Sequence, residues 1–429
     1  MKLSLSTLSL LLCLNSIGQN WNITEVNNLP ERVSNNAVCE GFSQDGNFVY
    51  SFAGIDSSLE SSSIHLKSWR MNTQTLQIDP LPDLPDTLGK VAAAASQVGN
   101  IIYIIGGYHV FANGNEVSSD KVHRFDVAQN QFISDGLPIP VPIDDHVQAV
   151  YRDSLIFVVT GWSNTENVAD VQIYNTYTNT WQAGTSTPNT AKYKCFGASG
   201  EILGDTIYYF GGAAGGAFAA QTELRKGYID PVDPTNISWS ETEPTPIITA
   251  YRAAACKTAD VVHWLGGSNV TYNFNAIAYN GSGLVEPADQ TVFYHPNSGL
   301  WGSEDVLHLP MDLRGVANVS PTQKYLIGGI SPNGNVLSSV LRLDYQGSLS
   351  ADDNDYESEA FLAPNPASNF LRTSNSGKLR LYDSTSKLIL TRAIQKQEVI
   401  DISTLPAGLY FASIQDENYF YHQCLVVAK

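Results

Sequence analysis

Residues 101–107 read Ile-Ile-Tyr-Ile-Ile-Gly-Gly, an apolar run typical of a β-strand that ends in two glycines. Glycine pairs suit places where two backbones approach closely or where φ must be positive. An apolar run followed by a pair of small residues recurs at five other places. The six copies are residues 48–54, 101–107, 155–161, 206–212, 261–267 and 325–329. Their spacing of about 50–60 residues indicates one structural unit repeated six times.

Aromatic residues form a second pattern behind these pairs. In four repeats an aromatic residue that ends one strand is followed seven positions later by another large apolar residue: Trp69 and Leu76, Phe125 and Phe132, Tyr174 and Trp181, and Tyr294 and Trp301. In the fourth repeat Tyr228 and Trp239 are further apart, because residues 230–234 (Asp-Pro-Val-Asp-Pro) are typical of a longer turn. The combination favours four-stranded blades with apolar inner strands and an outermost strand whose Trp packs under its neighbour.

The two ends of this repeat region complement each other. The sixth repeat ends at residues 341–345 with no Trp strand behind it, whereas residues 21–26 (Trp-Asn-Ile-Thr-Glu-Val) supply such a strand ahead of the first repeat. If this N-terminal strand completes blade 6, hydrogen bonds close the ring and no long edge stays open. The predicted fold class is therefore all-β, with a six-bladed β-propeller over residues 19–345. A content of 33 Gly and 20 Pro fits such a turn-rich chain.

By its Gly-Gly pairs and its Tyr-to-Trp spacing, the segment of residues 19–345 resembles kelch-repeat propellers. It departs from that family at Ala53-Gly54 and at Thr160-Gly161, where the doublet is replaced. The resemblance implies a binding platform or, in some members, an enzyme such as a mutarotase or a copper oxidase. No copper-ligand set can be placed in this sequence, and the fold alone does not assign a function.

One column of residues, directly before the expected innermost strands, is basic in five of six repeats. Its members are Asn36, Lys90, His146, Lys194, Arg252 and Arg314. In a propeller this column would surround the mouth of the central channel, where converging positive charges attract an anion and the arginines can grip a carboxylate or phosphate. We therefore predict these six as ligand-binding residues. The structural alternative is that they hold loops or pair with Asp144, Asp145 and Asp312.

Charge and motif content narrow the function classes. The formal net charge of −18 makes nucleic acid and anionic membrane surfaces poor partners. We find no His pair at helical spacing, no clustered Cys/His pattern and no phosphate-binding loop, so we predict no catalytic residue, no metal and no cofactor. This favours a binding protein over a carbohydrate-active enzyme (a sugar mutarotase or lyase), and both stay open. We expect a monomer whose propeller mouth binds an anionic or polar ligand, such as a glycan.

The first residues are typical of a secretory signal. Met1-Lys2 is followed by an apolar run over residues 3–14 and by small residues before a cleavage point after Gly18, which predicts a signal peptide over residues 1–18. The run is shorter than the ~20 apolar residues of a membrane span, and no other segment could cross a bilayer. The four other cysteines, Cys39, Cys195, Cys256 and Cys424, fall at different repeat offsets or in different domains. Buried free thiols are therefore favoured over disulfides.

A separate module follows the repeats. Residues 346–359 are small, polar and acidic, which predicts a solvated linker. Residues 360–429 contain short alternating strands typical of a small antiparallel β-sandwich. Its ordered motifs are Pro-Asn-Pro-Ala at 364–367, Leu-Arg-Leu-Tyr-Asp at 379–383, Ile-Asp-Ile-Ser at 400–403, Leu-Pro-Ala-Gly-Leu-Tyr at 405–410 and a terminal Lys429.

This order resembles the type A C-terminal sorting domain of type IX secretion, with one departure at Ser386, where that family usually has Gly. The resemblance implies a partner in the type IX secretion machinery and a Bacteroidetes-type host. The signal peptide would deliver the chain to the periplasm, and the tail would direct it to the extracellular space or the outer cell surface. Release and surface attachment both stay open.

Overall fold

The computed structural model describes residues 21–240, 248–297, 299–306, 309–346, 362–363, 367–373, 376–383, 388–415 and 420–429. The predicted signal peptide (residues 1–18) lies outside the described residues, and so does the predicted linker beyond Gln346. The chain divides into two compact units, Met1–Gly347 and Ser348–Lys429.

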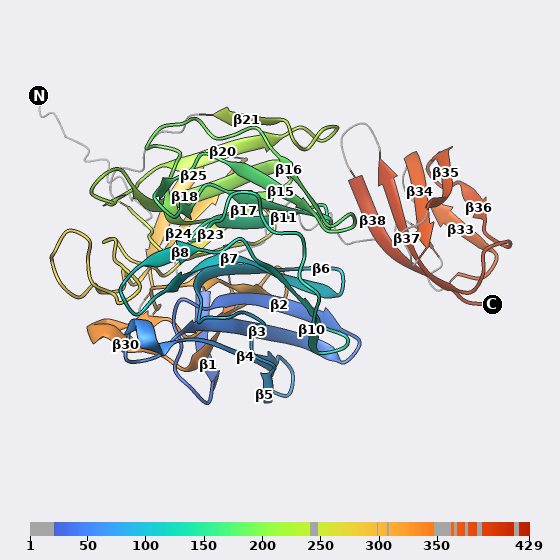
Figure 1. Ribbon diagram of the computed structural model, residues 1–429. Helices are drawn as coiled ribbons and strands as arrows, with labels where there is room; N and C mark the ends of the chain where they lie inside the picture. Colours follow the sequence, from blue (N-terminus) through green and yellow to red (C-terminus); the bar gives the residue numbers. More distant parts are fainter. Residues whose placement is uncertain are drawn as a thin grey trace, which may run out of the picture. The chain divides into compact units, whose positions relative to one another are not determined.

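The larger unit is a ring of six antiparallel sheets, which confirms the predicted six-bladed β-propeller (Figure 1). In blades 1 to 5 the strand nearest the axis comes first in the chain and the next strands are added outward, whereas the outermost strand of blade 6 is the N-terminal one. Blade 1 contains β2 (Ala37–Ser43), β3 (Gly46–Ile55), β4 (Ile64–Asn72) and β5 (Ile78–Leu81). Blade 2 contains β6 (Val91–Val98), β7 (Ile101–Val110), β9 (Val122–Asp126) and β10 (Gln131–Ile133). Blade 3 contains β11 (Val147–Tyr151), β12 (Leu155–Val159), β15 (Val171–Asn175) and β16 (Thr180–Ala183).

The other three blades repeat this order. Blade 4 contains β17 (Phe196–Leu203), β18 (Thr206–Ala214), β20 (Leu224–Ile229) and β21 (Ile237–Ser240). Blade 5 contains β22 (Ala254–Lys257), β23 (Val262–Leu265), β24 (Gln290–His295) and β25 (Leu300–Asp305). Blade 6 contains β27 (Ala317–Asn318), β28 (Gln323–Ile327), β31 (Ser339–Tyr345) and β1 (Trp21–Asn28).

The propeller also contains short strands and short 3-10 helices beside the main strands of the blades. They are β8 (Glu116–Ser118), β13 (Trp162–Ser163), β14 (Glu166–Asn167), β19 (Ala219–Ala220), β26 (Arg314–Gly315), β29 (Ile330–Ser331), β30 (Asn335–Val336) and the 3-10 helices η1 (Ser61–Ser63) and η2 (Pro332–Gly334). The pair β26 and β2 is parallel, with Arg314 opposite Ala37. The segment that enters blade 6 therefore also borders the innermost strand of blade 1.

The small-residue pairs lie in the second strand of a blade or directly after it, and the Gly-Gly pairs meet the segment that enters the following blade. Gly211 has φ 71°, and a Cβ atom there would lie 1.9 Å from the carbonyl oxygen of Ala250. No side chain fits at that distance, so the repeat requires glycine here. The exceptions Ala53 and Thr160 keep the left-handed backbone, with φ values of 55° and 48°.

The N-terminal strand forms the outer edge of blade 6. β1 pairs antiparallel with β31, and Trp21 lies opposite Tyr345. The Trp21 ring is buried, 4.9 Å from the ring of Tyr345 and 5.2 Å from that of His263, which belongs to blade 5. Residues more than 300 positions apart thus share one sheet and one hydrophobic cluster.

The smaller unit has two sheets, as expected for the predicted β-sandwich. One contains β32 (Leu362–Ala363), β33 (Phe370–Thr373) and β36 (Val399–Asp401). The other contains β35 (Leu388–Ile394), β34 (Gly377–Asp383), β37 (Gly408–Gln415) and β38 (Phe420–Val427). Leu371 and Ile400 of the first sheet share a buried cluster with Leu381, Ile414 and Leu425 of the second.

Two further findings concern the cysteines and the membrane. Cys39, Cys195 and Cys256 are buried and carry free thiols, and burial raises the pKa of each thiol. Within the described ranges, the structure contains no helix with the length and apolar character that a bilayer crossing requires.

Candidate ligand site on the propeller axis

The six residues of the predicted basic column do not form one open ring. Asn36 is buried and donates from Nδ2 to Ser51 Oγ at 2.8 Å. Lys90 is buried, with its Nζ 2.6 Å from Asp86 Oδ2 and 3.0 Å from Ser119 Oγ. Lys194 is partly exposed, and its Nζ lies 3.8 Å from Glu166 Oε2. The structure brings together only the remaining three, His146, Arg252 and Arg314.

Arg252 and Arg314 lie in a buried layer of alternating charges, which we call the ionic layer: Arg252, Asp145, Asp312 and Arg314. Arg252 contacts Asp145 in bidentate fashion at 2.6 and 3.1 Å, and its Nη1 donates to Asp312 Oδ1 at 3.0 Å. Arg314 Nη1 lies 3.5 Å from Asp145 Oδ1, and its Nη2 donates to the carbonyl oxygen of His146 at 2.8 Å. None of the four residues is more than 5% exposed. The two arginines and two aspartates balance in formal charge.

Unusual backbone geometry positions this layer. Asp145, Arg252 and Asp312 have φ values of 48°, 48° and 63°. Non-glycine residues rarely adopt this left-handed conformation, and its cost persists only where surrounding contacts hold it. The hydrogen bonds between the three side chains are such contacts. This pairing agrees with the structural alternative for the column, while ligand binding by the six residues stays a prediction.

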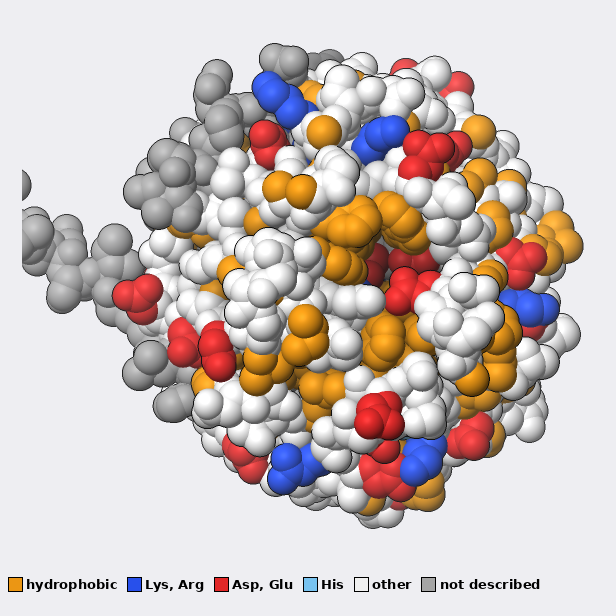
Figure 2. Space-filling view, turned by 60° about the vertical axis from the view of Figure 1, so that its left-hand side comes forward, with side chains coloured by type: hydrophobic (Ala, Val, Ile, Leu, Met, Phe, Trp, Pro, Cys, Tyr) orange, Lys and Arg blue, Asp and Glu red, His pale blue; other side chains and the backbone are white. Residues whose placement is uncertain are grey.

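A pocket of about 230 Å³ opens outside the ionic layer, and we call it the mouth pocket. Its lining residues are Tyr108, Glu116, Asp144, Asp145, Trp162, Phe196, Phe218, Arg252, Asn273 and Tyr279. The face that carries β8 is hollowed near the propeller axis, with acidic side chains in the hollow and hydrophobic side chains around it (Figure 2). Of the predicted column, only Arg252 lines this pocket.

Aromatic rings form one wall of the mouth pocket. Trp162 packs at 5.6 Å from Phe196 and 5.4 Å from Phe218, and Phe218 packs at 4.8 Å from Tyr279. We call Trp162, Phe196, Phe218 and Tyr279 the aromatic wall. All but Phe196 remain partly exposed, so the wall offers ring surface to a ligand.

A buried carboxyl group lies beside this wall. Asp144 and Trp162 exchange backbone hydrogen bonds of 3.0 and 2.9 Å, which fixes the two residues next to each other. Ser118 Oγ donates to Asp144 Oδ2 at 2.6 Å. Burial, and secondarily the neighbouring Asp145, raises the pKa of Asp144 well above its usual range. Its carboxyl therefore stays protonated to a higher pH than an exposed aspartate and can donate a hydrogen bond as well as accept one.

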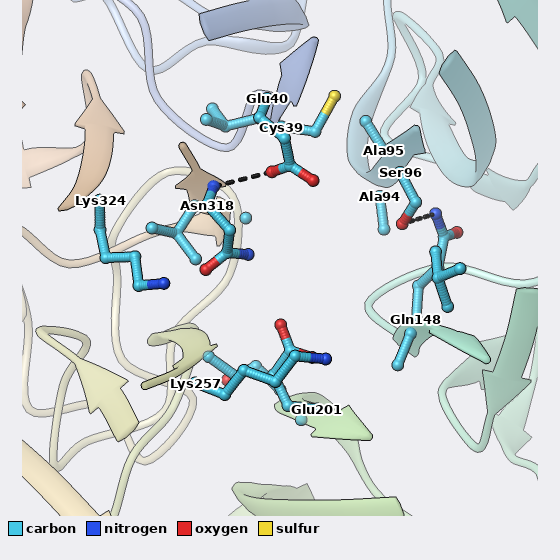
Figure 3. A pocket seen from close by; sticks show the side chains of 18 of the residues that line it. Cys39, Glu40, Ala94, Ala95, Ser96, Gln148, Glu201, Lys257, Asn318 and Lys324 are labelled. Atoms are coloured by element: carbon cyan, nitrogen blue, oxygen red, sulfur yellow. Dashed lines mark hydrogen bonds and ion pairs between the residues drawn. The ribbon is translucent and has the colours of Figure 1, made fainter. Parts of the chain in front are cut away.

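A second and larger pocket, about 580 Å³, lies on the other side of the ionic layer, and we call it the channel pocket (Figure 3). The innermost strands of the blades line it, and their inward residues are mostly small or polar. His146 and Arg314 belong to its wall, whereas Arg252 belongs to the mouth pocket. The ionic layer thus separates two pockets on one axis.

Sequence reasoning missed the aromatic wall. Trp162 directly follows the pair Thr160-Gly161, and Phe218 lies in the loop after Gly211-Gly212. The sequence signal that could have revealed the aromatic wall is an aromatic residue in several loops that follow the small-residue pairs. These loops differ in length, so the aromatic residues occupy no common column.

His146 provides a test of the buried axis. Burial, followed by the nearby Arg314, lowers the pKa of His146 to about 3. In the unfolded chain a histidine titrates near 6.5, so between these values the unfolded state binds the extra proton and stability falls as the pH falls. One such histidine should cost about 2 kcal/mol of unfolding free energy between pH 7.5 and 5. The variant His146→Gln should lose that much less over the same range, as measured by urea unfolding at both pH values.

The histidine resonances offer an independent check of this prediction. The imidazole signal of His146, assigned by its absence from the variant, should keep its neutral chemical shift at pH 5. A signal that titrates near pH 6.5 would contradict the prediction.

Two family models match the chain. The model of the KLHDC2/KLHL20/DRC7 Kelch-repeats domain matches residues 41–267. The model of the secretion system C-terminal sorting domain matches residues 362–428. Both resemblances drawn from the sequence are confirmed.

Known proteins show the same likeness at low identity. Kelch-like protein 23 of Pongo abelii is 29% identical over 214 residues, 46% of this chain and 33% of that protein. Kelch-like protein 15 of Danio rerio is 24% identical over 256 residues, 58% of this chain and 40% of that protein. The chain therefore spans well under half the length of these relatives. The solved structure of YjhT matches with a TM-score of 0.57 and 15% identity over 73% of this chain and 95% of that chain, which shows the fold alone.

Proposed function

The chain belongs to the kelch-repeat family and carries a secretion-system sorting domain, and from this premise we propose that its propeller is an exported binding module whose mouth pocket takes an uncharged polar ligand of the glycan class. The sorting domain directs export by type IX secretion to the cell surface or the extracellular space. The mouth pocket is the feature of the propeller that supports a ligand of this kind.

The charge balance of the axis favours an uncharged ligand over an anion. Both carboxylates of the ionic layer already form ion pairs with Arg252. Arg314 pairs with Asp145 and donates a hydrogen bond to the carbonyl oxygen of His146. An incoming anion would have to displace one of these buried carboxylates, and breaking a buried ion pair is costly. Glu116 and Asp145 also line the pocket, and their carboxylates would repel an anion.

The aromatic wall is the observation that carries the glycan class. Ligand sites combine aromatic surface with a few polar groups that fix orientation. Here Trp162, Phe218 and Tyr279 provide rings for the apolar face of a sugar, and Asp144, Asp145 and Asn273 provide acceptors and donors for its hydroxyl groups. The pocket volume of about 230 Å³ corresponds to part of a chain, so one or two sugar units would enter it.

Trp162 should contribute most to this binding. The variant Trp162→Ala should weaken the affinity for a neutral oligosaccharide by about tenfold, because a stacked aromatic contact contributes on the order of 1 kcal/mol beyond the area it buries. Titration calorimetry with cellotetraose, laminaritetraose and chitotriose would identify a ligand and measure the change.

Tyr177 gives the matched control, since it lies in the same blade, is 70% exposed and does not line the pocket. The variant Tyr177→Ala should bind like the wild type. If uronic-acid or sulfated oligosaccharides bind more tightly than the neutral ones at low salt, the uncharged assignment is wrong.

A carbohydrate-active enzyme is the second candidate, and Asp144 is the observation that favours it. A protonated carboxyl beside a sugar-binding wall has the properties of a general acid for opening or closing a sugar ring. Anomer exchange of D-glucose and D-galactose, followed by NMR with and without the protein, separates the two functions. Turnover that disappears in Asp144→Asn would favour the enzyme, and binding without turnover would favour the module.

A further inference from the structure

We propose that the channel pocket is a second ligand site, independent of the mouth pocket, and that it binds a small zwitterion of the short-peptide class. The two pockets share no lining residue. The ionic layer lies between them, with Arg252 on the mouth side and Arg314 on the channel side. A ligand of one pocket therefore does not depend on a ligand of the other.

Charged side chains of both signs face this space. Glu40 on β2, Glu201 on β17, Lys257 on β22 and Lys324 on β28 surround one opening (Figure 3). The Glu40 carboxylate accepts a hydrogen bond from the backbone N–H of Asn318 at 2.7 Å. Lys257 Nζ lies 3.3 Å from Glu201 Oε2. The four charges sum to zero, and Lys257 and Glu201 already pair with each other.

Lys324 and Glu40 are incompletely compensated. Lys324 is 2% exposed, and its Nζ donates to the carbonyl oxygen of Ser320 at 2.8 Å. Removal from water lowers the pKa of Lys324 and raises that of Glu40. Each group would gain from an opposite charge placed beside it.

A zwitterion matches this charge arrangement better than a simple ion does. An anion would be attracted by the lysines and repelled by the glutamates. A cation would be attracted by the glutamates and repelled by the lysines. A molecule with an ammonium group at one end and a carboxylate at the other can satisfy both pairs at once. The volume of about 580 Å³ lies in the range of sites for small molecules and exceeds the size of a single small amino acid, which favours a short peptide.

Four peptides of one backbone test the proposal. Triglycine carries both end charges, N-acetyltriglycine only the negative one, triglycine amide only the positive one, and N-acetyltriglycine amide neither. Saturation-transfer NMR and titration calorimetry with the full chain at low salt should give saturable binding of triglycine in the millimolar range or tighter. The three blocked peptides should bind about tenfold more weakly or worse, since each lacks at least one charged hydrogen bond.

Variants of the channel wall complete the test. Glu40→Gln and Lys324→Met should each weaken triglycine binding by about tenfold. Lys257→Met, at a partly exposed position, serves if either of those variants fails to fold by circular dichroism. Trp162→Ala should leave triglycine binding unchanged, which separates this site from the proposed mouth function.

Three results would overturn the proposal. The first is the absence of saturable triglycine binding in the millimolar range, which would leave water as the occupant of the channel. The second is equal binding of all four peptides, and the third is binding that survives every channel variant.

Discussion

The variant Asp145→Asn should lower the unfolding free energy of the propeller by about 3–5 kcal/mol. Asp145 is 2% exposed and is the carboxylate that Arg252 and Arg314 share. Asparagine keeps the shape of the side chain and tolerates the left-handed φ of 48°. The change therefore removes the negative charge and leaves two buried guanidinium groups with the single carboxylate of Asp312.

Asp153 provides a control that matches the backbone conformation. Its φ is also 48°, but it lies exposed in the turn between β11 and β12. The variant Asp153→Asn should change the unfolding free energy by no more than about 0.5 kcal/mol. Urea denaturation followed by tryptophan fluorescence measures both variants. A similar small effect for Asp145→Asn would mean that the ionic layer does not hold the blades together.

The propeller could be predicted from sequence because its signals repeat. Each of the four Gly-Gly pairs is required by a close approach between adjacent blades, as at Gly211 and Ala250, and pairs of small residues recur in all six repeats at a regular spacing. The burial of Trp21 beside Tyr345 links the two ends of the repeat region. The sequence therefore shows a packing constraint, the close approach of backbones, at every repeat of the blade.

The site could be predicted only in part, because its contacts are not periodic. The comparison of the six repeats placed His146, Arg252 and Arg314 near the axis, where the structure has them. Pairing with Asp145 was one of two alternatives that the sequence left open, because the contact between Asp145 and Arg252, 107 residues apart, depends on left-handed residues in two different loops. Lys90 occupies the same column but is turned toward Asp86 in its own connecting segment. A shared column fixes the height of a residue along the axis and leaves the direction of its side chain open.

Deleting Trp21–Asn28 should prevent the propeller from forming a stable monomer. The segment supplies the outermost strand of blade 6, which pairs with β31 from Trp21 opposite Tyr345 to Asn28 opposite Ser339. Loss of the Trp21 side chain alone should cost about 3–5 kcal/mol, as for other large residues removed from a core. The deletion also exposes the edge of β31, and an unpaired apolar edge promotes association between chains. Size-exclusion chromatography and limited proteolysis should detect aggregation and cleavage in blade 6.

Moving the strand tests whether closure, rather than the mere presence of these residues, is what matters. Because Trp21 lies opposite Tyr345 in an antiparallel pair, the segment of residues 21–28 joined behind Tyr345 through a short glycine turn can form the same ladder as a hairpin. This rearranged chain should recover the monomer and its protease resistance, since the backbone hydrogen bonds and the Trp21 contacts with Tyr345 and His263 are restored. A deletion variant that stays monomeric and resistant would show that five complete blades and three strands suffice. In that case the pairing of β1 with β31 would add little to the stability of the ring.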